Sequence, residues 1–519
     1  MKQSPFSRRK FSRSRYQEEV MFHNIIPLNE IPSKIWTTGL SFVSPLLKSL
    51  TNTPVDTLPA NVLSEIFMCT LSFNGFGSIA ERGRLALEPL ILSHVSRRWR
   101  SVALSHPQLW ATIWVDRPRP PHVPMVEMWL ERSQRASLVL YLRQTQQNAN
   151  FTDPDEHGLT EEIIKRFSSQ LYRWYRITLF FSLHTQKSML LLPDKPDSAP
   201  LLQHIHLATN DDWDRESKLK TEKILHSYSA LKSLVIHPST LQVHIHWNRL
   251  TELDTTQVGS PVANYITVLK LCRNLITAEL RITPDSLDAP FVRPYHRVSL
   301  PRLKSFAIHF DHTDAAPLLD CLVLQALEGF ALRYTRSHRR SNDANALRQL
   351  LARSGPSCVL KRFALQDNPR TRDHTAAHHL AFLQSPQMHG LIELALQIDL
   401  CDDVFRFLTL GSVEDGTPRN LPNLEIVSLK DVSGDHVEDL ELYRMVVSRL
   451  GQKTPLYGAV FNLCLNGHSE SRILPLLFER CRNSRVQLKV YLASCEDANS
   501  TSGWYTSEPI PGGYLTDVA

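Results

Sequence analysis

Residues 300–308 read Leu-Pro-Arg-Leu-Lys-Ser-Phe-Ala-Ile, and residues 303–308 follow the pattern apolar-x-x-apolar-x-apolar. Phe306 and Ile308 share one face, because successive side chains of a strand alternate between its two faces. Leu300-Pro301 precedes the pattern and marks its start. The segment therefore predicts a short strand with one buried face.

The same pattern recurs along most of the chain. Its copies start at Leu202, Leu231, Leu250, Leu275, Leu303, Leu327, Leu360, Leu391 and Leu424, so successive starts lie 19 to 33 residues apart. Segments of helical or loop character lie between them, such as 343–355 and 375–384. One strand with one return segment cannot bury its own apolar face, so neighbouring copies must stack into a solenoid.

This pattern resembles that of leucine-rich repeats, which run about 20–29 residues around a short LxxLxL strand. The asparagine ladder of the most regular repeats is missing, and the spacing is looser. The resemblance implies an irregular, curved α/β array over residues 135–495, with a long concave strand surface suited to holding another protein. Residues 137–143 and 171–181 are expected to begin this array.

Residues 54–115 carry a different, helical periodicity. Apolar residues at Leu58, Val62, Leu63, Ile66, Phe67 and Leu71 fall on one side of a helix. Pro59 suits the first helical turn, where its missing N–H costs nothing. Residues 72–88, with glycines and charges, read as a loop inserted between two helical parts.

A second helical stripe follows that loop. Leu92, Val95, Trp99 and Val102 are three or four residues apart, and Pro107 ends the helix. Leu109, Trp110 and Ile113 are apolar residues beyond it. Two or three short helices over about sixty residues form a marginal domain, which gains stability by docking on something else.

The ordered set Leu58-Pro59, Val62-Leu63, Ile66-Phe67, Val95-Ser96-Arg97-Arg98-Trp99 and Leu109-Trp110 resembles the F-box, and is especially similar to F-box-like proteins of mushroom-forming fungi. The resemblance implies a three-helix module that docks on a Skp-family adaptor and so joins a cullin–RING ubiquitin ligase. The adaptor-binding residues that it implies are Leu58, Pro59, Val62, Leu63, Ile66, Phe67, Val95, Arg98, Trp99 and Trp110. The usual module is contiguous, whereas here residues 72–88 separate its two parts.

The charge distribution and the cysteine content restrict the expected cellular location and the expected partners. The net charge is +6, but Lys2, Arg8, Arg9, Lys10, Arg13 and Arg15 precede the first acid, so the remaining chain is balanced and has no global basic footprint. Residues 1–53 are expected to be a basic, largely disordered segment, either a targeting signal or a solvated terminus, and 496–519 a flexible tail. Eight cysteines without a Cys-x-x-Cys pair, and no long apolar run, favour a cytoplasmic or nuclear protein without a membrane partner.

The sequence carries no recognisable motif for catalysis or for cofactor binding. His374 and His378 have helical spacing but no accompanying acid, and we expect no metal. His204 and His206 read as exposed strand residues, and Asp402-Asp403 as solvated loop charges. The aromatic and basic residues of 171–181 suit a half-buried strand better than a nucleic-acid surface. We therefore expect no enzyme activity, no cofactor and no nucleic-acid partner.

Together these patterns predict an α+β chain: a three-helix F-box-like module at 54–115 followed by an irregular leucine-rich-repeat-like solenoid. The expected function is substrate recognition within a Skp–cullin–F-box type ubiquitin ligase, with an unidentified protein target. The alternative is a repeat scaffold for protein interactions that has lost ligase coupling, an interpretation motivated by the interruption at 72–88.

Overall fold

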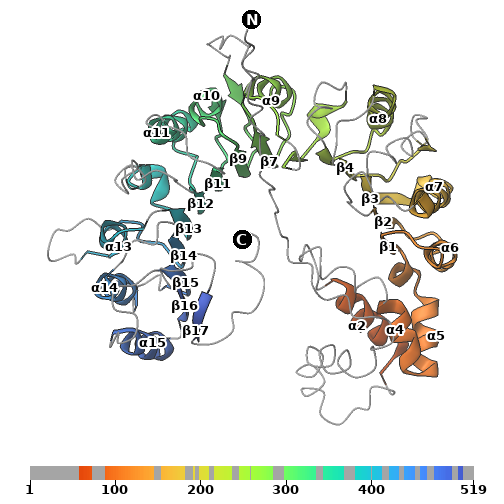
Figure 1. The fold of residues 1–519 in the computed structure, drawn as a ribbon, viewed down its shortest axis with the longest axis horizontal. Coiled ribbons are helices and arrows are strands. Elements are labelled where there is room, and N and C mark those ends of the chain that lie inside the picture. The colour runs from red at the N-terminus through yellow and green to blue at the C-terminus, as the bar shows by residue number, and fades with distance from the viewer. Residues whose placement is uncertain are drawn as a thin grey trace, which may run out of the picture. The chain divides into compact units, whose positions relative to one another are not determined.

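A computed structural model of the chain has a mixed α/β fold built on one large parallel sheet (Figure 1). The chain divides into two units, residues 1–66 and 67–519, and the division falls inside helix α2. The residues that the structure describes are 58–72, 88–144, 154–181, 191–192, 198–209, 215–236, 245–256, 259–284, 297–334, 343–367, 380, 382–398, 400–411, 420–431, 438–450, 456–463, 473–484, 486–493 and 501–506.

Helices and strands alternate along most of the second unit. The helices are α2 (Ala60–Ser72), α4 (Glu88–Val95), α5 (Arg97–Ser105), α6 (His122–Arg132), α7 (Pro154–Ser168), α8 (Arg215–Ser227), α9 (Val262–Leu269), α10 (Ala316–Leu319), α11 (Asp343–Ser354), α13 (Asp402–Leu408), α14 (Asp439–Arg449) and α15 (Ile473–Asn483). Short 3-10 turns include η4 (Pro107–Trp110) and η5 (Leu171–Arg173).

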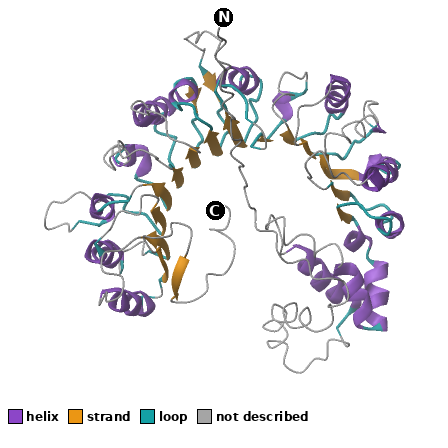
Figure 2. Ribbon diagram, viewed as in Figure 1, coloured by secondary structure: helices purple, strands orange, loops and turns teal. Residues whose placement is uncertain are grey.

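The strands are β1 (Thr112–Asp116), β2 (Leu138–Arg143), β3 (Trp174–Phe181), β4 (His204–Thr209), β5 (Ser233–Ile236), β6 (Glu252–Asp254), β7 (Thr277–Ile282), β8 (Val298–Ser299), β9 (Ser305–Phe310), β10 (Leu322–Val323), β11 (Gly329–Tyr334), β12 (Arg362–Gln366), β13 (Glu393–Ile398), β14 (Ile426–Asp431), β15 (Gly458–Leu463), β16 (Gln487–Ala493) and β17 (Thr501–Thr506). Fifteen of them form one sheet in chain order, and β8 pairs with β10 separately. All neighbours in the large sheet are parallel except β16 and β17. Helices α6 to α15 lie along one face of this sheet (Figure 2), and we call the opposite one the helix-free face.

Each predicted copy of the apolar pattern is confirmed as a strand. The strand begins two residues after the leading leucine in every case, as at Leu303 and β9 or Leu424 and β14. The leading leucines are all buried, and the carbonyl that follows each one joins adjacent strands. The Lys304 carbonyl, for example, accepts both the Glu328 and the Gly329 N–H at 2.8 Å.

Two rows of apolar side chains face the helices. The first row, in strand register, is Ile113, Leu140, Ile177, Ile205, Leu234, Leu253, Ala278, Phe306, Phe330, Phe363, Leu394, Val427, Ala459 and Leu488. Every member is at most 4% exposed. The row runs without interruption from β1 to β16, so the core is continuous rather than divided among repeats.

A buried arginine links the end of α13 to the residues that precede β14. Arg449 on α14 is 1% exposed, and its guanidinium donates to the carbonyls of Leu408, Asn420 and Leu421. Leu421 has a positive φ of 49°, an uncommon conformation for a bulky residue. Burial lowers the pKa of Arg449 to about 10, still high enough for the charged form at neutral pH. Arg173 holds the turn after α6 in the same way, donating to the Ala136 carbonyl and the Ser133 hydroxyl.

The sheet extends beyond the predicted array at both ends. Its first strand is β1, well before residue 135, because Trp110-x-x-Ile113-x-Val115 is the repeat pattern with tryptophan in the leading position. Part of the expected flexible tail, Thr501–Thr506, forms β17 against β16. Threonine and aromatic residues favour strands, and β16 would otherwise present an unpaired edge. Residues 1–53 and most of 72–88 lie outside the described residues.

We expect Arg449→Met to lower the free energy of unfolding by about 2–4 kcal/mol, because several buried carbonyls lose their donor. Urea unfolding followed by circular dichroism measures the change. Arg480→Met, at an exposed site on α15, is the matched control and should leave the midpoint in place. Equal midpoints for the two variants would contradict the role assigned to Arg449.

Candidate interaction surfaces

The predicted adaptor-binding residues at the start of the module, on or just before α2, fall into a buried and an exposed group. Leu63 and Phe67 lie one turn apart and have no exposed surface. They can support a surface but cannot touch a partner. The members of the group that retain exposed surface are Leu58, Pro59, Val62 and Ile66.

The second helical stripe is broken at Ser96, which sequence periodicity did not predict. Ser96 has an extended backbone (φ −154°, ψ 167°), and its hydroxyl accepts the Trp99 N–H at 3.1 Å. A serine side chain that accepts from the third residue onward starts a new helix. The segment is therefore two helices, α4 ending at Val95 and α5 starting at Arg97.

This break places Val95 on the outside. Val95 is 43% exposed, and Ile91, one turn earlier on α4, is 47% exposed. Leu104 on α5 is a third exposed apolar residue. Ile91 and Leu104 were missed from the sequence; the spacing of four between Ile91 and Val95 was the available signal.

Trp99 and Arg98 are half-buried at the start of α5. The Trp99 ring packs on Phe67, with ring centroids 4.9 Å apart. Arg97 and Arg100 are exposed. Trp99 therefore combines packing against α2 with some surface that a partner can reach.

Trp110 is fully buried, unlike the exposed residues of α4. Its indole N–H donates to the Ala103 carbonyl of α5 at 2.8 Å, and its ring meets Trp129 of α6 edge-on at 5.0 Å. Trp174, the first residue of β3, forms a matching bond by donating its indole N–H to the Phe167 carbonyl of α7. Trp110 therefore joins α5 to the first repeat rather than presenting a surface.

The helix-free face of β1 to β4 carries a cluster of aromatic side chains. The rings of Trp114 and Tyr141 stack with centroids 3.4 Å apart and planes 4° apart. Phe180 lies 5.7 Å from Tyr141 and meets His206 nearly at right angles at 4.7 Å. These four residues are called the aromatic cluster below.

The histidines expected to be exposed on β4 are half-buried instead. Burial lowers the pKa of His206 to about 4, and burial together with nearby Arg176 lowers that of His204. Both are therefore uncharged at neutral pH. His374 and His378, the two histidines at helical spacing, lie outside the described residues.

Further along the same face, polar and charged side chains pair between neighbouring strands. Glu279 on β7 lies 3.2 Å from His309 on β9, and Arg281 pairs with Asp311. The hydrogen bond from His309 holds the pKa of Glu279 below its usual value. Burial raises the pKa of neighbouring Asp254. Such pairs are typical of cross-strand stabilisation.

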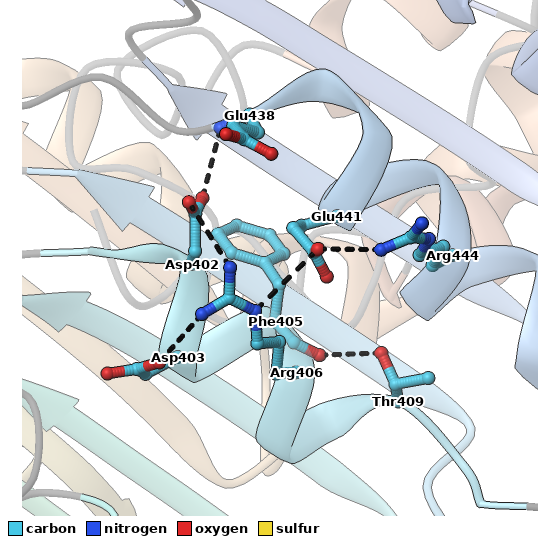
Figure 3. Close-up of polar contacts among 8 residues, drawn as sticks. All are labelled: Asp402, Asp403, Phe405, Arg406, Thr409, Glu438, Glu441 and Arg444. Carbon is cyan, nitrogen blue, oxygen red and sulfur yellow. Dashed lines mark hydrogen bonds and ion pairs between the residues drawn. The ribbon is translucent and has the colours of Figure 1, made fainter.

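Asp402 and Asp403 lie in the first turn of α13, not in a loop. Arg406 contacts both carboxylates, at 3.8 and 3.1 Å, and also lies 3.6 Å from Glu441 of α14 (Figure 3). Glu441 in turn accepts from Arg444 at 2.9 Å. Asp402 and Asp403 are therefore paired within α13, and the contact between Arg406 and Glu441 joins α13 to α14.

Within the described ranges, no three His, Cys, Asp or Glu side chains gather closely enough to hold a metal ion. No helix in that part of the chain is both long and apolar enough to cross a membrane. No protein-family model matches the chain, and no curated protein is significantly similar to it.

The low pKa of His206 should make the free energy of unfolding of the protein depend on pH. The folded value is about 4, against about 6.5 in an unfolded chain. Between these values the unfolded state binds a proton that the folded state excludes, so stability is full above pH 6.5 and falls as the pH is lowered. The loss from this residue should reach about 2–3 kcal/mol at pH 4.5.

Replacing His206→Gln should remove that part of the acid sensitivity. Urea midpoints of wild type and variant at pH 7 and 4.5 give the comparison. A variant that loses as much stability as wild type on acidification would show that His206 is not the titrating group.

Proposed function

We propose that this chain is a non-catalytic substrate-recognition subunit of a Skp–cullin–F-box type ubiquitin ligase, acting in the cytoplasm or nucleus. The observation that supports the proposal best is the exposed apolar pair Ile91 and Val95 on α4. It lies directly before the Ser-Arg-Arg-Trp segment that resembles an F-box. An exposed apolar pair at helical spacing suits docking on another subunit.

The joint between α5 and the sheet supports the same role. Trp110 ends the 3-10 turn that precedes β1, and its indole N–H donates to the Ala103 carbonyl of α5. This hydrogen bond links α5 to the start of the sheet. A subunit docked on α4 and α5 would then be held in a defined position relative to the first strands. A ligase receptor acts by holding its target near the transfer machinery, so a stiff joint contributes directly to its effect.

The helix-free face provides the second surface that such a receptor needs. Side chains at alternate strand positions face it across the fifteen-stranded sheet. They combine aromatic rings, paired charges and small residues, a mixture suited to recognition of a protein. Val95, an exposed member of the implied adaptor set, lies on α4 and belongs to the other surface.

The chain should co-purify with its host's Skp-family adaptor, and the double change Ile91→Asp with Val95→Asp should weaken that pairing by about tenfold or more. Burying two apolar residues in an interface contributes on that scale, and unpaired carboxylates oppose it. Titration calorimetry with purified adaptor measures the effect.

Leu476→Asp on α15 is the control, because Leu476 is equally exposed but lies at the other end of the array. Circular dichroism should show that all variants keep their fold. Failure of wild type to bind the adaptor would reject ligase coupling and favour the repeat scaffold. Equal binding by the double variant would remove α4 from the contact.

A further inference from the structure

Several charged side chains of the helix-free face are paired within the sheet. Arg143 donates to both oxygens of Asp116 at 2.8 and 2.7 Å, and Arg281 pairs with Asp311. Two other groups of charges on this face lack a partner of this kind among the described residues. The two groups are opposite in sign and lie on different strands.

The first group is acidic and lies on β6 and β7. It consists of Glu252, Asp254 and Glu279, and Asp254 and Glu279 are register partners. The side chains of Glu252 and Glu279 are 50% and 43% exposed. Their contacts are with histidines: Glu252 lies 3.9 Å from His204, and Glu279 lies 3.2 Å from His309. In the described part of the chain, no Lys or Arg nitrogen lies within ion-pair distance of these carboxylates.

The second group is basic and contains Arg362 on β12 and Lys430 on β14. Both side chains are exposed, and neither forms a hydrogen bond or an ion pair with another described residue. The guanidinium of Arg362 lies over the backbone of Gly329. A Cβ on Gly329 would come to 3.4 Å from Arg362 Nη2 and 3.6 Å from Ser305 Oγ. The glycine therefore leaves room for a cation that is held on the face and still open to a ligand.

Nearby carboxylates do not cancel the basic group. Glu393 is the register partner of Arg362, and Glu425 precedes β14. Burial raises the pKa of Glu393, and the charge of Glu425 adds to that rise. Arg333 on β11 contributes a third cation to the same face. Positive charge therefore exceeds negative charge from β11 to β14.

A row of small side chains joins the two groups. In strand register, Glu279 is followed by Ala307, Ala331, Ala364 and Ala395. Longer side chains flank these methyl groups, among them Gln366 and Gln397 on the next row. The two side-chain amides form no hydrogen bond with a described residue. Because an amide both donates and accepts, they suit the backbone of a segment that crosses the alanines.

Strand spacing sets the length of such a segment. Parallel strands are about 4.8 Å apart, so Glu279 lies roughly 14 Å from the Arg362 position and roughly 24 Å from the Lys430 position. An extended chain rises about 3.3 Å per residue, so about four to seven residues cover these distances. The spacing decides only the length, whereas the two unpaired groups decide the chemistry.

We propose that the helix-free face of β6 to β14 binds an extended segment that carries Lys or Arg at one end and Asp or Glu at the other. The cationic end pairs with Glu252 and Glu279, and the acidic end pairs with Arg362 and Lys430. The backbone between them crosses the alanine row. This deepens the proposed function, on which it rests for one point: that the segment belongs to the target protein.

Fluorescence anisotropy with the full-length chain and two labelled peptides tests the proposal. The block peptide is Lys-Lys-Ser-Ala-Ser-Ala-Ser-Glu-Glu, and the mixed peptide is Lys-Glu-Ser-Ala-Ser-Ala-Ser-Lys-Glu. Their composition and net charge are the same, so a difference in affinity reports the charge pattern. Exposed ion pairs each contribute modestly, and together they should make the block peptide bind roughly fivefold or more tightly. The preference should disappear in about 1 M salt.

Reversing one charge at either end of the face should weaken block-peptide binding. Arg362→Glu and Glu252→Lys are each expected to cost about threefold or more. Arg480→Glu and Glu479→Lys, at exposed positions of α15, make the same charge changes away from the face. These controls should stay within about twofold of wild type. Thermal melts confirm that each variant folds.

Equal binding of the block and mixed peptides would overturn the proposal, as would a preference that survives high salt. Tighter binding of an all-lysine or all-glutamate peptide would overturn it too, because one group alone would then suffice. The adaptor titration is independent of this assay. Loss of adaptor binding with the block-peptide preference retained would reject the ligase role alone, and the reverse result would reject the proposed segment alone.

Discussion

The structure depends on burial of the apolar rows that face the helices, and no repeat can bury its part of a row alone. Phe306, Phe330 and Phe363 illustrate this, because each ring packs on the next strand's ring, at centroid distances of 5.9 and 6.3 Å. Every strand therefore needs a neighbour on both sides. The first and last parallel strands lack a parallel neighbour on one side. At one end β17 pairs antiparallel with β16, and at the other end α5 and Trp110 precede β1. The segment that resembles an F-box thus adjoins the point where the array most needs a cap.

The position of each strand relative to its leading leucine is constant, although the repeats differ in length. Strands start two residues after each leading leucine even though the starts are 19 to 33 residues apart. Variation in length is confined to the helical side and its turns, where tolerance of insertions is greater. Arg173 and Arg449 are found there, and each donates to backbone carbonyls between a helix and the following strand. A forked, permanently charged side chain with several donors suits irregular turns of this kind.

The sequence predicted the strands well because a single leucine position carries the signal, from Leu202 to Leu424. It missed β1 because Trp110 stands in that position, and it missed the break at Ser96 because apolar spacing continues smoothly across a helix cap. It also grouped Leu63 and Trp110 with Val62 and Val95, since periodicity identifies a stripe but not which members a neighbouring segment covers. The aromatic cluster was out of reach for a different reason. Trp114, Tyr141 and His206 are far apart in the chain, and only strand register brings them into one row.

That row offers a comparison within the molecule. On β9, β11, β12 and β13 it carries Ala307, Ala331, Ala364 and Ala395, whereas on β1 and β2 it carries Trp114 and Tyr141. The strands pair in the same parallel manner in both places, so the difference lies in the side chains. Alanine satisfies the fold at these positions without leaving a buried nitrogen unpaired. Trp114 and His206 are less favourable for the isolated chain than alanine would be. The Trp114 and Tyr141 rings instead stack on one another, and Tyr141 is only 7% exposed, so the large side chains bury each other at this end of the sheet.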